Sequence, residues 1–319
     1  MADHLSARPA PPLRVGVVGV GYLGRFHALI YSRLDQVELV GVCDTDAERA
    51  ASVAAEADCA RWDDPLALIG RVDAVSIAVP TTAHRDVACA YLEQGVHVLL
   101  EKPLAVDGSE GRAIVQAAED ANAVLQVGHL ERFNAGIMAL AARIDGPRYI
   151  ETQRMGGFVE RATDVDVVAD LMIHDLDIIL ALVEAELVDV RAVGTPVLTE
   201  RIDIASARLE FSNGTVANAV ASRVSDKKTR RIRVFQPSGY LSLDFMDQTL
   251  DIAVPERRDT AERGMIKRSS VTVEPIRPLD REIEAFVDCV RHRKPPLVDG
   301  KTGLRALELA LQVQASIAG

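Results

Sequence analysis

The chain has 319 residues, of which 48% are hydrophobic and 26% charged, and its formal net charge at pH 7 is −11. This length exceeds the usual size of a single core, so it predicts two domains with the composition of a soluble globular protein. The negative charge argues against nucleic acid or an anionic membrane surface as a partner, because either would be repelled on average.

Residues 1–12 lack the apolar core of a signal peptide, and we expect them to form a flexible tail. From residue 13 to residue 127, β-branched runs alternate with helix-like runs, which predicts a parallel sheet covered by helices. The expected strands are RVGVVG, VELVGVCD, DAVSIAVP, GVHVLLEK and AVLQVGH. The sequence therefore predicts an N-terminal domain of the α/β class over residues 13–127.

Residues 128–319 follow a different pattern, with period-two alternation and turns such as Asn213-Gly214 between the runs. The expected strands are VDVRAVGTPV, IDIASARLEF, TVANAVASR, RRIRVFQPSGYLSLDF and SSVTVEP. They predict a second α/β domain on a mostly antiparallel sheet. From Asp280 the chain returns to helix, and these final helices could pack back on the first domain.

The cysteine pattern bears on compartment and metal content. Four cysteines are scattered without CxxC spacing, so they indicate neither a zinc site nor a disulfide framework, and we expect no metal. A reducing cytoplasm is the natural compartment for such a chain. No apolar run is long enough to cross a bilayer, so we expect no membrane partner.

A glycine motif follows the first expected strand. Gly19, Gly21 and Gly24 form a GxGxxG before a helix-like run, and the acid Asp44 ends the next strand. In this context the motif is a dinucleotide fingerprint of the Rossmann type, with the phosphates at the helix N-terminus. Asp44 should accept hydrogen bonds from the adenosine ribose and repel a 2′-phosphate, which favours NAD over NADP. The alternatives are a glycine-rich turn without a ligand and a helix N-cap at Asp44.

The stretch ADLMIHDLDIIL, residues 169–180, carries acids and a histidine inside an apolar run. At the helical angle of about 100° per residue, Asp170, His174 and Asp177 form one narrow polar stripe, and Asp175 lies roughly 140° away. The surrounding apolar surface implies burial on several sides, so we expect the stripe to face a cleft. The alternative is an ordinary amphipathic surface helix.

A second motif, LLEKPLA, places Glu101, Lys102 and Pro103 at the carboxyl end of an expected parallel strand, where ligands bind in open α/β sheets. Together with the GxGxxG, the segment VPTTAH at residues 79–84 and the Asp170-x-x-x-His174 pair, it resembles the glucose-fructose oxidoreductase / inositol dehydrogenase / MocA family. The resemblance covers essentially the whole chain. It implies a Rossmann domain, a C-terminal domain with an open antiparallel sheet, a tightly held NAD and a homo-oligomer, dimer or tetramer, assembled through that sheet.

Within the family the sequence is most similar to the branch that oxidises UDP-N-acetylglucosamine at its 3-hydroxyl in bacterial lipid A synthesis. The segments that carry this likeness are VGYLGRFHA, VGHLERFN and TDVDVVADLMIHDLDIIL. The cofactor-binding residues implied by the fingerprint and the resemblance are Gly19, Gly21, Tyr22, Leu23, Gly24, Asp44, Val79, Pro80, His84, Glu101 and Lys102.

Oxidation of a secondary alcohol requires a base beside the hydroxyl and a positive group for the developing alkoxide. His174 fits the base, since its ordinary pKa of about 6.5 lies near working pH. Asp170, one turn earlier, could orient the imidazole, and Lys102 would supply the ammonium. Sequence does not decide whether Lys102 or His174 carries the proton, and the two could titrate as a coupled pair. The alternatives are that Lys102 is an ordinary surface lysine and that His174 is a histidine of the core.

The expected substrate residues lie in the segments most like the nucleotide-sugar branch: Arg132, Phe133, Asn134, Arg154, Arg161 and Asp177. The three arginines could meet a diphosphate through bidentate contacts. Asp177 could bind a sugar hydroxyl or be a solvated helix acid. Our hypothesis is an NAD-dependent dehydrogenase acting on UDP-N-acetylglucosamine. The alternatives are a dehydrogenase of a free sugar or cyclitol, which would not need the arginines, and a non-catalytic NAD-binding sensor.

Overall fold

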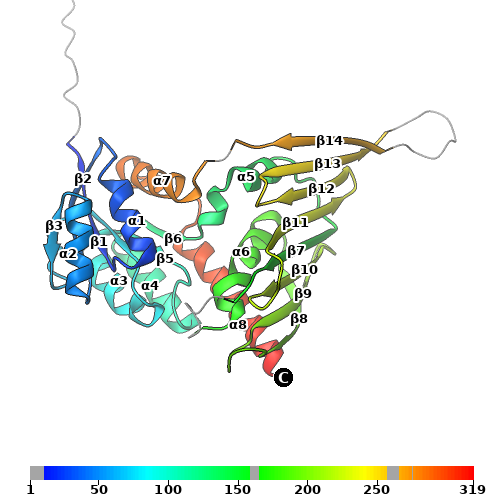
Figure 1. Cartoon of the computed structure of the whole chain (residues 1–319), viewed down its shortest axis with the longest axis horizontal. Helices are drawn as coiled ribbons and strands as arrows, with labels where there is room; N and C mark the ends of the chain where they lie inside the picture. Colours follow the sequence, from blue (N-terminus) through cyan, green and yellow to red (C-terminus); the bar gives the residue numbers. More distant parts are fainter. Residues whose placement is uncertain (1–10, 159–164, 257–265, 275) are drawn as a thin grey trace, which may run out of the picture. The chain divides into compact units, whose positions relative to one another are not determined.

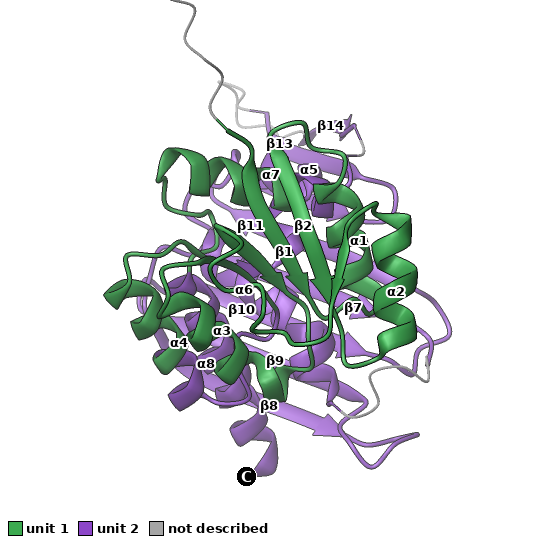
Figure 2. Ribbon diagram, turned by 90° about the vertical axis from the view of Figure 1, so that its left-hand side faces the viewer, with its two compact units in different colours: residues 1–101, 113–126, 283–299 green, residues 102–112, 127–282, 300–319 purple. Residues whose placement is uncertain are grey.

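The computed structural model describes residues 11–158, 165–256, 266–274 and 276–319 (Figure 1). Most of the expected tail, and Arg161, lie outside these ranges. The chain divides into two compact units (Figure 2), which are described separately. Unit 1 comprises residues 1–101, 113–126 and 283–299, and unit 2 comprises residues 102–112, 127–282 and 300–319. In the described part of the chain, no helix is long and apolar enough to span a membrane.

Unit 1 is built on a six-stranded sheet in the order β3-β2-β1-β4-β5-β6. The strands are β1 (Leu13–Val18), β2 (Val37–Cys43), β3 (Ala60–Trp62), β4 (Ala74–Ile77), β5 (His97–Glu101) and β6 (Leu125–Gly128). Strand β1 pairs in parallel with β2 and β4, β2 with β3, and β4 with β5. This order is that of a Rossmann domain, as expected. The short strand β3 was not predicted, because its sequence ARW lacks a β-branched run.

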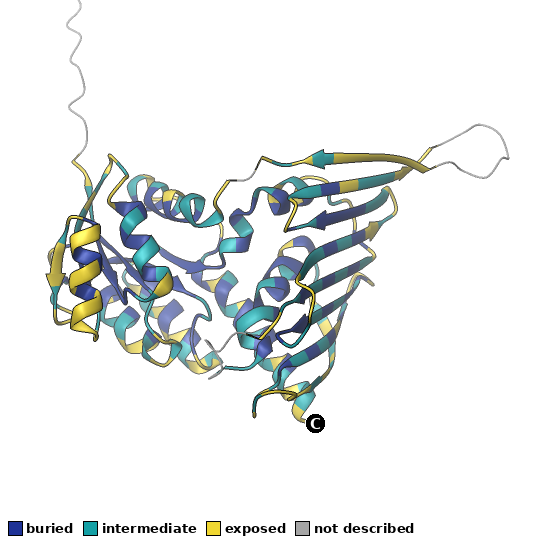
Figure 3. Cartoon of the chain, viewed as in Figure 1, coloured by how far each residue is buried: buried dark blue, intermediate teal, exposed yellow. Residues whose placement is uncertain are grey.

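Helices cover the unit 1 sheet and bury its central strands. The helices of this region are α1 (Tyr22–Tyr31), α2 (Ala47–Glu56), α3 (His84–Leu92), α4 (Gly108–Asp120) and α7 (Pro278–His292), with a short 3₁₀ turn η1 (Thr81–Ala83). Every residue of β4 and β5 is buried, and Figure 3 shows dark blue, buried segments inside this part of the molecule. A strand covered on both faces needs mostly apolar side chains, and in AVSI and HVLLE only Ser76, His97 and Glu101 are polar.

Unit 2 is built on an eight-stranded sheet in the order β14-β13-β12-β11-β7-β10-β9-β8. The strands are β7 (Tyr149–Met155), β8 (Leu187–Thr195), β9 (Ile204–Phe211), β10 (Val216–Ser222), β11 (Thr229–Gln236), β12 (Gly239–Asp244), β13 (Thr249–Pro255) and β14 (Ile266–Thr272). Only the β7–β10 pair among these is parallel, so the predicted mostly antiparallel sheet is confirmed. Strands β7 and β13 were not predicted.

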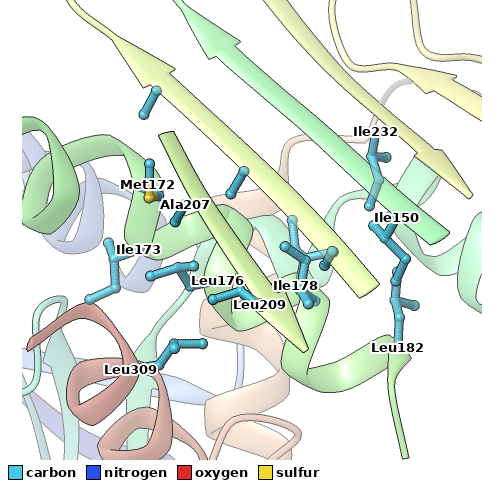
Figure 4. Close-up of a cluster of buried hydrophobic side chains, with 14 of the residues drawn as sticks. Ile150, Met172, Ile173, Leu176, Ile178, Leu182, Ala207, Leu209, Ile232 and Leu309 are labelled. Carbon is cyan, nitrogen blue, oxygen red and sulfur yellow. The ribbon is translucent and has the colours of Figure 1, made fainter. Parts of the chain in front are cut away.

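Helices α5 (Ala135–Ala141), α6 (Ile173–Leu182) and α8 (Gly300–Ala318) lie on one side of this sheet (Figure 1). Burial alternates along β7 and β9, because successive side chains point to opposite faces of a strand. The inward side chains form the core of the unit with helix α6, and Figure 4 shows Leu176 and Ile178 of α6 beside Leu209 of β9. Each fully buried Leu or Ile contributes about 1.5–3 kcal/mol, so α6 is held firmly in place.

The segment leading into α6 departs from regular helix. Val168–Met172 form a wide π-helical turn, and the α-helix begins at Ile173. Asp166 holds the start of this turn: its Oδ1 accepts hydrogen bonds from the amides of Val168 and Ala169, at 3.0 and 2.9 Å, and its Oδ2 accepts one from Gln314. Wide turns of this kind occur frequently at functional sites.

Candidate active site

The glycine loop of unit 1 has the geometry that a dinucleotide requires. Gly19 has a φ of +83°, and a Cβ there would lie 2.6 Å from the carbonyl oxygen of Ala78. A Cβ on Gly24 would lie 1.8 Å from the carbonyl oxygen of Gly19, so both positions exclude any side chain. At Gly21, by contrast, a Cβ would meet nothing within 4 Å. The backbone is therefore bare on the side where a pyrophosphate would approach.

Gly21 is also the N-cap of α1, and no side chain among the described residues caps that helix. A helix N-terminus without a side-chain cap directs its first amides and its dipole toward an anion. Tyr22 and Leu23 form the first turn, with Tyr22 exposed and Leu23 half-buried. These residues fit the phosphates of a dinucleotide.

Asp44 follows β2 and has only 7% of its side chain exposed. Its Oδ2 accepts from the amide of Val20 at 2.8 Å, and its Oδ1 accepts from the amide of Asp46 at 2.9 Å. Burial would raise the pKa of this carboxyl, but the hydrogen bonds from Arg49 and the two amides outweigh it and lower the pKa. Asp44 is therefore a fixed carboxylate at the end of β2, the position of the acid that contacts the adenosine ribose in NAD-binding Rossmann domains.

The remaining expected cofactor residues of unit 1 also lie at the carboxyl edge of its sheet. Val79 and Pro80 follow β4, and the Nε2 of His84 lies 3.0 Å from the carbonyl oxygen of Val79. Glu101 ends β5 and is buried, with its Oε1 3.1 Å from the Nε2 of the fully buried His27. We did not predict His27. Its position in GRFHA, within a quoted segment of the resemblance, was the available signal.

In unit 2, Lys102 is joined to the start of the polar helix. Its Nζ donates to the backbone carbonyl of Asp170 at 2.8 Å and to Oδ1 of Asp170 at 3.3 Å. Both side chains are largely buried. The structure thus brings two predicted catalytic residues together, but Asp170 bonds to Lys102 rather than to His174 as we had expected.

His174 lies in the first turn of α6, and its Nδ1 is buried without a hydrogen-bond partner among the described residues. The ring of His129 packs edge-on against it, with 6.4 Å between ring centroids. Burial lowers the pKa of His174 well below its ordinary value, and the nearby charges of Lys102 and Arg154 lower it further. The imidazole is therefore neutral near pH 7 and able to accept a proton.

Arg154 of β7 is enclosed by acids. It donates to both carboxylate oxygens of Asp175, at 3.1 and 3.0 Å, and to Oε1 of Glu131 at 2.9 Å. All three side chains are buried, and the guanidinium also lies 5.6 Å from the ring centre of Phe245. Burial would lower the pKa of Arg154, but Asp175 and Glu131 outweigh it and raise the pKa. Arg154 thus ties β7 to α6 and to the segment of Glu131.

Asp177 is buried, and its Oδ1 accepts from Arg132 at 3.3 Å. Its Oδ2 is buried without a hydrogen-bond partner among the described residues, so Asp177 is not a solvated helix acid. Arg132 lies on the 3₁₀ turn η2 (Leu130–Phe133), with 15% of its side chain exposed. Phe133 is buried, and Asn134 caps α5 through the amides of Gly136 and Ile137.

Three further residues near this cluster were not predicted. Glu131 lies inside the quoted segment VGHLERFN, as does His129, but neither had a spacing that indicated its partner. Asp166 precedes the polar helix and accepts hydrogen bonds from the amides of Val168 and Ala169, and an aspartate just before a helix is a recognisable signal. Within the described ranges, no group of three or more His, Cys, Asp or Glu side chains is arranged to hold a metal ion.

Comparison with known proteins agrees with this geometry. Residues 13–129 match the model of an oxidoreductase family with an NAD-binding Rossmann fold, and residues 136–242 match the GFO/IDH/MocA C-terminal domain. The chain is therefore an oxidoreductase of the glucose-fructose oxidoreductase / inositol dehydrogenase / MocA family, and its cofactor is NAD.

The chain is similar along nearly its whole length to UDP-N-acetylglucosamine 3-dehydrogenase of Acidithiobacillus ferrooxidans, with 42% identity over 96% of this chain and 97% of the relative. A solved structure of that enzyme superposes with a TM-score of 0.91, covering 97% of this chain and 98% of the other. The scyllo-inositol 2-dehydrogenase (NAD(+)) of Bacillus subtilis is 30% identical over 67% of this chain and 68% of its own.

Proposed function

We propose that this enzyme oxidises the C3 hydroxyl of UDP-N-acetylglucosamine, giving a 3-keto sugar that a separate aminotransferase could use in lipid A synthesis. The observation that carries the chemistry is the pair of Lys102 on Asp170 beside a neutral His174 in unit 2. The substrate is supported by the identity of 42%, over almost the full length of both chains, to an enzyme named for this reaction.

Each of the two basic side chains would have a separate task. Bound NAD would accept the hydride. His174, whose pKa is lowered, would take the proton from the hydroxyl oxygen. Lys102, held by two oxygens of Asp170, would keep its ammonium directed at the oxygen on which negative charge develops. Asp170 would then position Lys102 rather than the imidazole.

The arginines would have different roles in substrate binding. Among the described residues Arg132 contacts one acid, Asp177, and part of its side chain is exposed, so donors remain for a phosphate oxygen. Arg161 is proposed as a second phosphate contact from its sequence position alone. Arg154 directs three nitrogens to Asp175 and Glu131, and we propose that it positions the substrate site without touching the sugar nucleotide.

The test is NADH formation with UDP-N-acetylglucosamine, free N-acetylglucosamine and myo-inositol, followed by NMR of the product. We expect turnover with the nucleotide sugar, a keto group at C3, and poor use of the other two compounds. Turnover of inositol alone would support the cyclitol alternative, which the inositol dehydrogenases among the relatives favour. Tight NAD binding without turnover of any of the three would support the sensor.

We also propose a cytoplasmic homo-oligomer, a dimer or tetramer assembled through the free face of the unit 2 sheet. Outward residues of β7 and β9 are partly exposed, although both strands have a neighbouring strand on each side. All four cysteines are free thiols, which fits a reducing compartment. Light scattering after size exclusion would test the oligomer, and a monomeric mass at micromolar concentration would contradict it.

A further inference from the structure

We propose that Arg49 sets how strongly this enzyme discriminates between NAD and NADP, by competing for Asp44 and by offering a cation to a 2′-phosphate. Arg49 lies in the first turn of α2 and forms two hydrogen bonds with Asp44. Its Nε donates to Oδ2 at 3.2 Å, and its Nη2 donates to Oδ1 at 2.9 Å. The inference rests on NAD as the cofactor and is independent of the sugar.

The carboxylate of Asp44 has little acceptor capacity left. Each oxygen accepts one backbone amide, from Val20 or Asp46, and one nitrogen of Arg49, and Oδ1 also has a long contact of 3.5 Å with the hydroxyl of Thr45. A carboxylate offers about four lone-pair positions, so the two amides and the two nitrogens of Arg49 already fill it. A ribose that donates two hydroxyl hydrogen bonds to Asp44 must therefore displace some of these donors.

Arg49 is the donor that can leave. The two amides belong to the backbone of the glycine loop and of the turn before α2, which the fold fixes. The Arg49 side chain is 45% exposed, whereas that of Asp44 is 7% exposed. An ion pair with one partner in solvent is weak, because water screens it and the long side chain loses freedom in it. Displacing Arg49 therefore costs little free energy, but this cost weakens the binding of every dinucleotide whose ribose bonds to Asp44.

A displaced Arg49 remains attached to the first turn of α2, close to the ribose that replaced it. Rossmann domains that bind NADP commonly use an arginine in this region for the 2′-phosphate. Asp44 and Arg49 thus act in opposite directions on the same group: the carboxylate repels the 2′-phosphate, and the guanidinium attracts it. Arg49 should make the preference for NAD smaller than Asp44 alone would impose.

The experiment measures dissociation constants of NADH and NADPH by fluorescence titration of the full-length protein. In Arg49→Ala we expect equal or tighter NADH binding and weaker NADPH binding, so that the NADPH-to-NADH ratio of dissociation constants rises about tenfold, as for loss of one charge-assisted hydrogen bond. A ratio that stays the same or falls would overturn the proposal.

The control is Arg14→Ala. Arg14 also donates Nε and Nη2 to an aspartate, Asp73, and is similarly exposed, but it lies at the start of β1, away from the glycine loop that follows this strand. In Arg14→Ala we expect the NADPH-to-NADH ratio of dissociation constants to stay as in the unaltered protein. An equal rise in Arg14→Ala would trace the effect to net charge and reject a specific role of Arg49.

Measurements in the Asp44→Ala variant separate the two effects of Arg49, its competition with the ribose for Asp44 and its attraction of the 2′-phosphate. In Asp44→Ala the guanidinium keeps only its longer ion pair with Asp46, at 3.7 Å, and the repulsion from Asp44 is gone, so NADPH should bind more tightly than to the unaltered protein. Adding Arg49→Ala should remove the part of that gain that comes from the guanidinium. Retention of the full gain in the double variant would contradict the proposal. Binding is read without turnover, so failure of the proposed sugar substrate would leave this result interpretable.

Discussion

Lys102 donates hydrogen bonds to two atoms of Asp170, its backbone carbonyl at 2.8 Å and its Oδ1 at 3.3 Å. The lysine of the EKP motif is thus fixed to the wide turn Val168–Met172 that leads into the helix of His174. One of these two bonds is to backbone, so it survives removal of the carboxylate. Asp170→Asn should therefore lower turnover less than Lys102→Ala does.

Lys102→Ala removes the ammonium from this arrangement, and we expect turnover to fall about 100-fold or more because the developing alkoxide loses its positive partner. NADH binding, followed by fluorescence, should remain within a fewfold of normal. Lys294→Ala is the matched control, since Lys294 pairs with Asp288 on the exposed surface, and it should leave turnover unchanged. Near-normal turnover in Lys102→Ala would reject the mechanism.

His174 should leave its signature in the pH dependence of the reaction. A base must be neutral, so kcat/KM should fall as pH drops through its pKa, which burial and the charge of Lys102 place well below the ordinary value of about 6.5. We expect kcat/KM to stay constant from pH 7 down to the lowered pKa of His174 and to fall only below that pKa. His174→Ala should lower turnover about 100-fold and abolish this limb. If the residual activity of His174→Ala still falls at low pH in the same way, another group causes that fall.

Arg132→Ala tests the phosphate contact. We expect the KM for the sugar nucleotide to rise about tenfold, the loss of one charge-assisted hydrogen bond, with the KM for NAD unchanged. Arg132→Lys should recover part of the loss because it keeps the charge next to Asp177. Thermal unfolding of each variant would show whether the buried Asp177 destabilises the protein. An unaltered KM in a folded Arg132→Ala protein would remove this arginine from the substrate site.

Arg154→Leu tests the buried cluster. Removing the guanidinium leaves Asp175 and Glu131 buried without their shared cation, which costs about 3–5 kcal/mol of unfolding free energy. Arg208→Ala breaks an exposed pair with Glu210 and should cost about 1 kcal/mol or less. Urea denaturation would measure both. Similar losses in the two variants would show that the Arg154 cluster contributes no more than a surface pair.

The dinucleotide site of unit 1 could be predicted because the residues that indicate it lie close together in the sequence. Gly19 and Gly24 lie in the turn between β1 and α1 and in that helix, and Asp44 follows the next strand, where its carboxylate accepts the amide of Val20. The partners of Arg154 were not predictable in the same way. Glu131 and Asp175 come from separate elements, and only the folded sheet brings them to β7.

The polar helix was predicted in outline but not in detail. A constant angle of about 100° per residue assumes a regular helix, whereas the π-helical turn at residues 168–172 winds more slowly. Asp170 therefore need not lie above His174, and it bonds to Lys102 instead. Strand β7 was missed because its sequence YIETQRM places charged and polar residues on the outward face and in the Arg154 cluster.

The parallel pairing of β7 with β10 also bears on how the protein is made. Helix α6 and strands β8 and β9 lie between these two strands in the chain, so the centre of the sheet cannot close until β10 has been synthesised. Until then the apolar sides of α6 have no complete surface to pack on, and such distant pairings form slowly. A nascent chain that stalls before Val216 should therefore depend on chaperones, and substitutions in β10 should lower the yield of soluble protein before they alter the chemistry at His174.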